Sequence, residues 1–117
     1  MNSKQKTYEE KRRFIMNATK WKEIFEAFYY GVECSDAPKR IQWTTKSTTG
    51  YLYSDSTWTH FGCTMESSEE IEWLKIELTP EDRELVLAIL RKIHVPGEVQ
   101  ADHAIIYGYR NDVDYIC

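Results

Sequence analysis

The segment Ile71-Glu-Trp-Leu-Lys-Ile-Glu-Leu78 runs directly into Thr79-Pro-Glu-Asp82, and these two stretches decide the fold. Apolar and charged residues alternate in the first stretch, which predicts a β-strand over residues 71–78 with one face in the core. The inward residues would be Leu74, Ile76 and Leu78, with Trp73 on the opposite face.

The second stretch predicts the start of a helix. Thr79 is a good N-cap, Pro80 suits the first helical turn, and the two acids that follow lie where the helix dipole favours negative charge. Apolar residues then recur at helical spacing up to Ile93, and Pro96-Gly97 ends the helix.

Upstream of this pair, short β-patterns alternate with turn residues. Residues 41–45 alternate as a strand, Ser47–Gly50 make a turn, and Tyr51–Tyr53 begin a second strand. A third strand is predicted over Trp58–Met65, with Phe61, Cys63 and Met65 on one face, followed by a polar loop at residues 65–70. Downstream, Ala104–Tyr109 form the last strand, in which Gly108 indicates a bulge or a close backbone approach.

The N-terminal part is predicted to be helical. Thr7 and Glu10 fit a capping box, and apolar residues then recur every three or four positions from Phe14 to Tyr30. Gly31 would end this helix as a left-handed cap. Asn17 or Thr19 is an alternative cap, which would leave residues 1–16 as a separate, looser helix or arm. We favour a break near Asn17.

A chain of 117 residues has room for one domain, spanning residues 1–117. The predicted order is helix, several strands, helix, strand. We therefore expect an α+β fold: a mostly antiparallel sheet of four to five strands with helices packed on one face.

The sequence also excludes several protein classes. No apolar run reaches the length of a membrane span, and the first residues lack the apolar core of a secretory signal, so a cytoplasmic location without membrane contact is expected. The three cysteines are odd in number and widely spaced, which favours reduced thiols: Cys34, Cys63 and Cys117.

Charge is unevenly distributed along the chain, whose net charge is −4. Residues 1–40 carry nine basic and six acidic side chains, whereas residues 41–117 carry six basic and thirteen acidic ones. Such a field repels nucleic acid and attracts a basic protein partner. A solvated surface that keeps the protein in solution is the alternative interpretation.

Few residues in the sequence indicate a catalytic, metal or cofactor site. His60 and Cys63 are three residues apart, but no second pair of ligands accompanies them, so no metal site is predicted. A cysteine nucleophile would need Cys63 beside His60 or His103. The five glycines are scattered and form no phosphate-binding loop, and no cofactor is predicted.

Two stretches, Asn17–Phe25 and Ile71–Leu74, are similar to a family of small uncharacterised bacterial proteins. The small, acidic, aromatic-rich α+β chain as a whole resembles the immunity proteins of contact-dependent growth inhibition and related polymorphic toxin systems. That resemblance implies a non-catalytic protein that binds and neutralises a cognate toxin domain, often a nuclease with a basic cleft.

Residues in loops and at strand ends can contact such a partner without disturbing the core. The candidates are acidic and aromatic: Tyr53, Asp55, Trp58, Glu66, Glu69 and Glu70. Two alternatives remain at this stage, a regulatory or scaffold module that binds another protein and a small enzyme that uses His60 and Cys63. The sequence predicts no oligomeric state.

Overall fold

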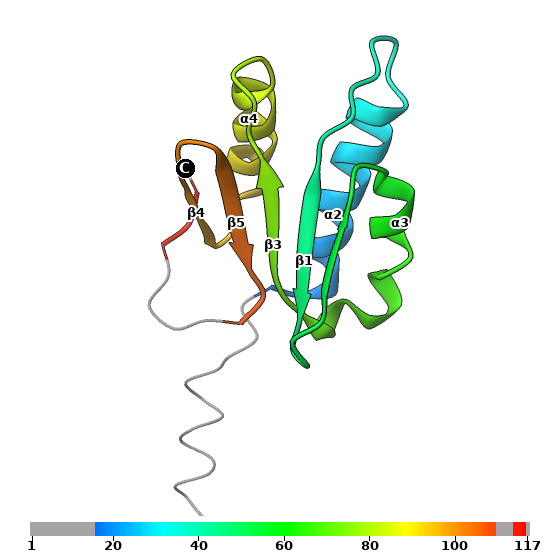
Figure 1. Cartoon of the computed structure of the whole chain (residues 1–117), viewed down its shortest axis with the longest axis vertical. Helices are drawn as coiled ribbons and strands as arrows, with labels where there is room; N and C mark the ends of the chain where they lie inside the picture. The colour runs from blue at the N-terminus through cyan, green and yellow to red at the C-terminus, as the bar shows by residue number, and fades with distance from the viewer. Residues whose placement is uncertain (1–15, 110–113, 117) are drawn as a thin grey trace, which may run out of the picture.

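The computed structural model describes residues 16–109 and 114–116. Figure 1 shows its helices and strands. In order they are α2 (Ala18–Phe28), the π-helical turn η1 (Tyr29–Glu33), β1 (Trp43–Ser47), β2 (Leu52–Asp55), α3 (Trp58–Gly62), the 3₁₀ segment η2 (Met65–Glu70), β3 (Ile71–Glu77), α4 (Arg83–Ile93), β4 (Gly97–Val99) and β5 (His103–Tyr107).

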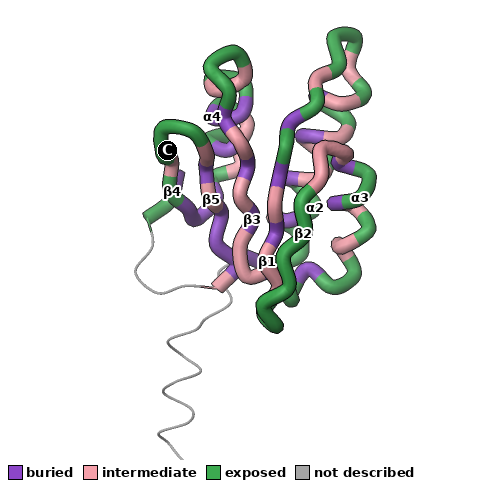
Figure 2. Tube along the Cα trace, in the orientation of Figure 1, coloured by how far each residue is buried: buried purple, intermediate pink, exposed green. Residues whose placement is uncertain are grey.

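The strands form one antiparallel sheet in the order β2-β1-β3-β5-β4, which confirms the α+β fold class. Figure 1 shows α2 and α4 side by side behind the sheet, with α3 next to β2. The sheet residues that face the helices are buried, whereas the intervening residues are partly exposed on the open face (Figure 2). The buried set includes Trp43, Leu74, Ile76, Ala104 and Ile106.

An aromatic cluster joins α2, α3 and β1. Trp58 stacks on Phe28 with ring centroids 4.5 Å apart, and Phe61 lies 5.4 Å from Trp43. The indole Nε1 of Trp58 donates to the carbonyl oxygen of Ile41 at 3.2 Å. Each aromatic pair adds about 1 kcal/mol to the free energy of unfolding beyond its buried area. The cluster therefore fixes α3 against the sheet.

The first described helix begins where a break was expected. The Asn17 side-chain oxygen accepts from the Lys20 backbone N–H at 2.8 Å, and Asn17 itself is extended, so α2 starts at Ala18. The capping box at Thr7 and Glu10, and the arm except for the buried Met16, lie outside the described residues.

The predicted third strand over Trp58–Met65 is wrong, because this segment forms α3 and the start of η2. Trp58 and Phe61 are the buried pair, and their three-residue spacing is helical, whereas Cys63 is exposed. The backbone N–H of Trp58 donates to a Glu33 side-chain oxygen at 3.0 Å, which caps α3 from a distant part of the chain.

Two helices also end differently from the sequence prediction. Gly31 does not end the first helix, because the chain continues through η1 and Gly50 is the only described glycine with a positive φ. His94, at φ 63°, ends α4 in the left-handed conformation. The segment after it, Gly97–Val99, is a strand that the sequence reading missed.

The start of α4 is later than predicted. A turn separates Thr79 from the helix, which begins at Arg83. The Thr79 hydroxyl oxygen accepts from the Asp82 backbone N–H at 3.2 Å, so Thr79 stabilises this turn rather than the helix end. Gly108 confirms the predicted close approach, because a Cβ there would lie 2.1 Å from the carbonyl oxygen of Ile71.

Candidate functional site

The outer edge of β2 carries a group of exposed apolar side chains. Tyr51 is 68% exposed, Leu52 58% and Tyr53 39%, and they are consecutive in the chain. β2 pairs with β1 on one side only, so it is an edge strand of the sheet. We refer to the backbone and side chains of residues 51–55 as the β2 edge.

The backbone of the β2 edge also offers free hydrogen-bonding groups. The Ser47 N–H donates to the Tyr51 carbonyl at 2.8 Å, which makes this a hydrogen-bonded pair of the β1–β2 hairpin. Bonded pairs alternate with non-bonded pairs in an antiparallel ladder, so Tyr53 and Asp55 also pair with β1. The N–H and C=O groups of Leu52 and Ser54 therefore point away from β1, and no described residue bonds to them.

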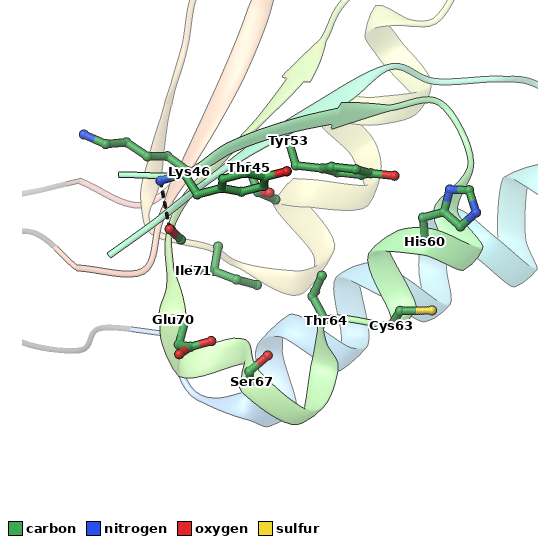
Figure 3. Close-up of a pocket in the computed structure, with 11 residues that line it drawn as sticks. Thr45, Lys46, Tyr53, His60, Cys63, Thr64, Ser67, Glu70 and Ile71 are labelled. Atoms are coloured by element: carbon green, nitrogen blue, oxygen red, sulfur yellow. Dashed lines mark hydrogen bonds between the residues drawn. The ribbon is translucent and has the colours of Figure 1, made fainter. Parts of the chain in front are cut away.

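A pocket of about 400 Å³ opens beside this edge, between the hairpin and the α3–η2 segment (Figure 3). Figure 3 shows Tyr53 on one side of it and Thr64 and Ser67 on the other, with Ile71 between them. Its lining includes Thr45, Tyr51 and Tyr53 from the hairpin, His60, Cys63 and Thr64 from α3 and its end, and Ser67 and Glu70 from η2. We call it the hairpin pocket.

Asp55 connects the hairpin to α3. One carboxylate oxygen accepts from the Tyr53 hydroxyl at 2.9 Å and contacts His60 Nδ1, and the other accepts from the Ser56 and Thr57 backbone N–H groups. The His60 hydrogen bond, followed by the Thr57 N–H, holds the Asp55 pKa well below its usual value of 3.8. The same carboxylate raises the pKa of Tyr53. This network positions Tyr53 and His60 at the pocket.

The 3₁₀ segment η2 carries several acidic side chains, of which Glu70 lines the other side of the pocket. Glu66, Glu69 and Glu70 lie on η2, are exposed, and form no ion pair with any residue between 16 and 109. The nearby ammonium of Lys46, by contrast, is paired with Glu72 at 3.1 Å. The unpaired carboxylates give this end of the molecule an excess of negative charge.

Most of the predicted partner-contacting residues gather here. Tyr53 and Glu70 line the hairpin pocket, Asp55 adjoins it, and Glu66 and Glu69 share η2 with Glu70. Trp58 is the exception: it is 1% exposed and belongs to the aromatic cluster, so its prediction as a surface contact is wrong.

Sequence reasoning missed Tyr51 and Leu52. The run of three apolar residues between two turns predicts a strand, but nothing in it shows that the strand lies at the edge of the sheet. Thr64 and Ser67 were also missed, because they line the pocket only once the supposed strand folds into α3 and η2.

The residues of the enzyme alternative are only partly brought together. His60 and Cys63 line the same pocket, and Asp55 orients the His60 ring as a catalytic carboxylate would. The Cys63 thiol, however, forms no hydrogen bond with His60, and His103 lies on β5 bonded to Asp102. Within the described chain, no three metal-binding side chains cluster.

A second hollow, of about 540 Å³, lies between α2 and α4 and is lined mainly by apolar side chains of the two helices. None of the predicted contact residues lies in it. Among residues 16–109 and 114–116, no helix combines the length and the apolar character needed to cross a bilayer.

Comparison with known proteins gives a family but no function. No curated protein and no solved structure matches the chain. The model of a family of unknown function, DUF6678, matches residues 4–113, and the chain therefore belongs to that family.

Proposed function

We propose that the protein is a non-catalytic binding module that holds a basic protein partner against the β2 edge and the acidic side chains of η2. The observation that carries this proposal is the run Tyr51–Tyr53, which is exposed on an edge strand beside a pocket and near carboxylates of η2 that have no ion pair in the described chain. Aromatic side chains supply much of the binding energy in interfaces, and nearby charge increases the association rate.

We further propose that the partner is a cognate bacterial toxin domain and that the protein acts in the cytoplasm as its immunity protein. A nuclease whose cleft is basic would be the electrostatic complement of η2 and of the net charge of −4. The overall resemblance to immunity proteins supports this identity. A regulatory or scaffold module would use the same surface, and only the partner's identity separates the two.

The experiment is co-expression of the protein with the product of the gene next to its own, scored by pull-down and by rescue of growth. A stable complex that relieves toxicity supports the proposal. A neighbouring product that is neither toxic nor bound would contradict the toxin assignment, and the protein-binding role would then require another partner.

The acidic surface can be tested in the same assay. Replacing both Glu69 and Glu70 with Lys should abolish protection with little change in Tm, because both side chains are exposed and unpaired in the described chain. The matched control replaces Glu23 and Glu26 on α2 with Lys, which changes the net charge equally at another surface. Equal loss of protection in both variants would point to net charge alone. Full protection by the Glu69/Glu70 variant would reject η2 as part of the interface.

An enzyme that uses His60 and Cys63 would need both side chains for its reaction even where partner binding is intact. If thiol chemistry were required, Cys63→Ser and His60→Gln would each abolish protection while binding persisted. We expect protection by both variants to follow how well each binds the partner, because the thiol and the imidazole form no hydrogen bond.

A further inference from the structure

We infer that the partner contributes an extended segment that pairs with the outer edge of β2 as an additional strand and places an arginine or lysine side chain in the hairpin pocket. This inference rests on the proposed function, since it specifies how the same surface would hold its partner.

The backbone of β2 has the arrangement that strand addition requires. Leu52 and Ser54 each direct one N–H and one C=O group outward, and they are two residues apart, as the bonding residues of an antiparallel strand are. Both residues are exposed, so an incoming strand can reach these groups. Strand addition to a free sheet edge is a common mode of peptide recognition.

The β2 edge is short, at four residues, and ends in a charged side chain, but it lacks the other features that protect free edges. Exposed edge strands also commonly carry lysine or proline, or are bulged or covered. Residues 51–55 are Tyr-Leu-Tyr-Ser-Asp, which contain neither lysine nor proline, and their pairing with β1 is regular. An apolar edge of this kind favours pairing with another strand.

The hairpin pocket opens on the side of the sheet toward which half of the side chains of an added strand would point. Side chains of a paired strand alternate between the two faces of the sheet. Thr45 and Tyr53 face each other in register on the helix side of the hairpin, and both line the pocket. One row of the incoming side chains would thus lie on the side of the sheet where the pocket opens (Figure 3).

The charges around the pocket favour a cation. Lys46 is paired with Glu72, and His60 is bonded to Asp55, so Glu70 is the lining charge that has no ionic partner in the described chain. The Tyr53 ring can pack against the aliphatic part of an arginine or lysine, while Glu70 pairs with its charged end. A second copy of this chain would instead carry the same net charge of −4, and like-charge repulsion disfavours its pairing at this edge.

The test is a selection of random twelve-residue peptides on the immobilised full chain, with the selected peptides synthesised and their Kd measured by fluorescence anisotropy. We expect arginine or lysine to be enriched at alternate positions. Leu52→Pro should weaken binding about tenfold more than the matched control Leu52→Ala, because only the proline variant loses an outward N–H group. Glu70→Gln should weaken it about fivefold, as expected for loss of one charged partner.

A second measurement keeps the test independent of how Leu52→Pro folds. In ¹⁵N-labelled wild-type protein, the selected peptide should shift the amide resonances of Leu52 and Ser54. Selection of no peptide, enrichment of acidic peptides, or equal binding by the two Leu52 variants with unshifted amides would overturn the inference. Self-association of the wild type through this edge, detected by sedimentation, would also overturn it by identifying a second copy as the occupant.

The two proposals fail in different ways. Peptide binding at the β2 edge without any bound neighbouring gene product would reject the toxin assignment and retain the strand-addition mode. A toxin complex that is insensitive to Leu52→Pro would retain the immunity function and reject strand addition.

Discussion

The two edges of the sheet differ in how far the rest of the described chain covers them. At the β4 edge, residues 114–116 run alongside the strand start: the Gly97 N–H donates to the Asp114 carbonyl at 2.9 Å, and the Ile116 N–H donates to the Val95 carbonyl at 2.8 Å. Tyr115 stacks on His94, and Ile116 is 5% exposed. At the β2 edge, no described segment covers the outward groups of Leu52 and Ser54.

Within the described part of the chain, backbone groups are therefore covered at the start of β4 but not at β2. The covered β4 edge contributes to the free energy of unfolding, because it buries apolar area and satisfies backbone groups. The exposed side chains of Tyr51 and Leu52 contribute little, so they are available to a partner. Substitutions at the two edges separate the stabilising role of one edge from the binding role of the other.

The largest effect is expected from Trp58, which lies beneath the hairpin. Trp58→Ala should lower the free energy of unfolding by about 4 kcal/mol, because it removes a fully buried indole from the aromatic cluster. The control Tyr51→Ala, at an exposed position of the β2 edge, should change it by less than about 0.5 kcal/mol. Urea unfolding measures both. Near-equal losses of unfolding free energy in the two variants would contradict the assignment of Trp58 to the core and of Tyr51 to an exposed edge.

A second pair of substitutions compares the two edges directly, with a smaller expected change in the free energy of unfolding. Ile116→Ala at the covered edge should cost about 3 kcal/mol, whereas Leu52→Ala at the bare edge should cost less than about 0.5 kcal/mol. Both changes shorten a branched aliphatic side chain, so the difference reports coverage. In the binding assays the order should be reversed, with Leu52 affecting the partner and Ile116 having no direct effect. A large loss of stability in Leu52→Ala would mean that the β2 edge is also covered.

The smallest effect concerns the end of β2. The folded state holds the Asp55 pKa below 3.8, so its stabilising contribution is complete above that pH and is lost as the pH falls below it. Asp55→Asn should therefore reduce Tm at pH 6, and the difference from the wild type should shrink toward pH 3. Circular dichroism at several pH values measures this. A difference that is constant with pH would contradict the role of the carboxylate, and Glu69→Gln, at an unpaired carboxylate in the described chain, serves as the control.

Local patterns predicted most of the sheet. Alternation identified β1 and β3, the turns on either side of Tyr51–Tyr53 located β2, and the inward set of Leu74, Ile76 and Leu78 is buried as expected. The error at Trp58–Met65 arose because alternation and helical spacing overlap in a short apolar run, and the cap that favours the helix, Glu33, lies far away in the sequence. β4 was missed because it is three residues long and depends on its pairing with β5.

The candidate site was predictable in its chemistry but not in its geometry. The acidic character of residues 66–70 and the aromatic character of the hairpin are visible in the sequence, and both lie at the site. The Asp55–His60 contact and the pocket depend on α3 turning back beneath the hairpin. That turn is set by the aromatic cluster, whose members come from separate elements, so no local pattern predicts it.

The central claim is that the β2 edge is occupied by a partner strand in the working state. Hydrogen–deuterium exchange of the Leu52 and Ser54 amides, compared between the free protein and its complex with the neighbouring gene product, tests this most directly. We predict that both amides exchange rapidly in the free protein and slow by about a hundredfold or more in the complex, as hydrogen-bonded strand amides do. A stable complex in which both amides continue to exchange rapidly would contradict the claim.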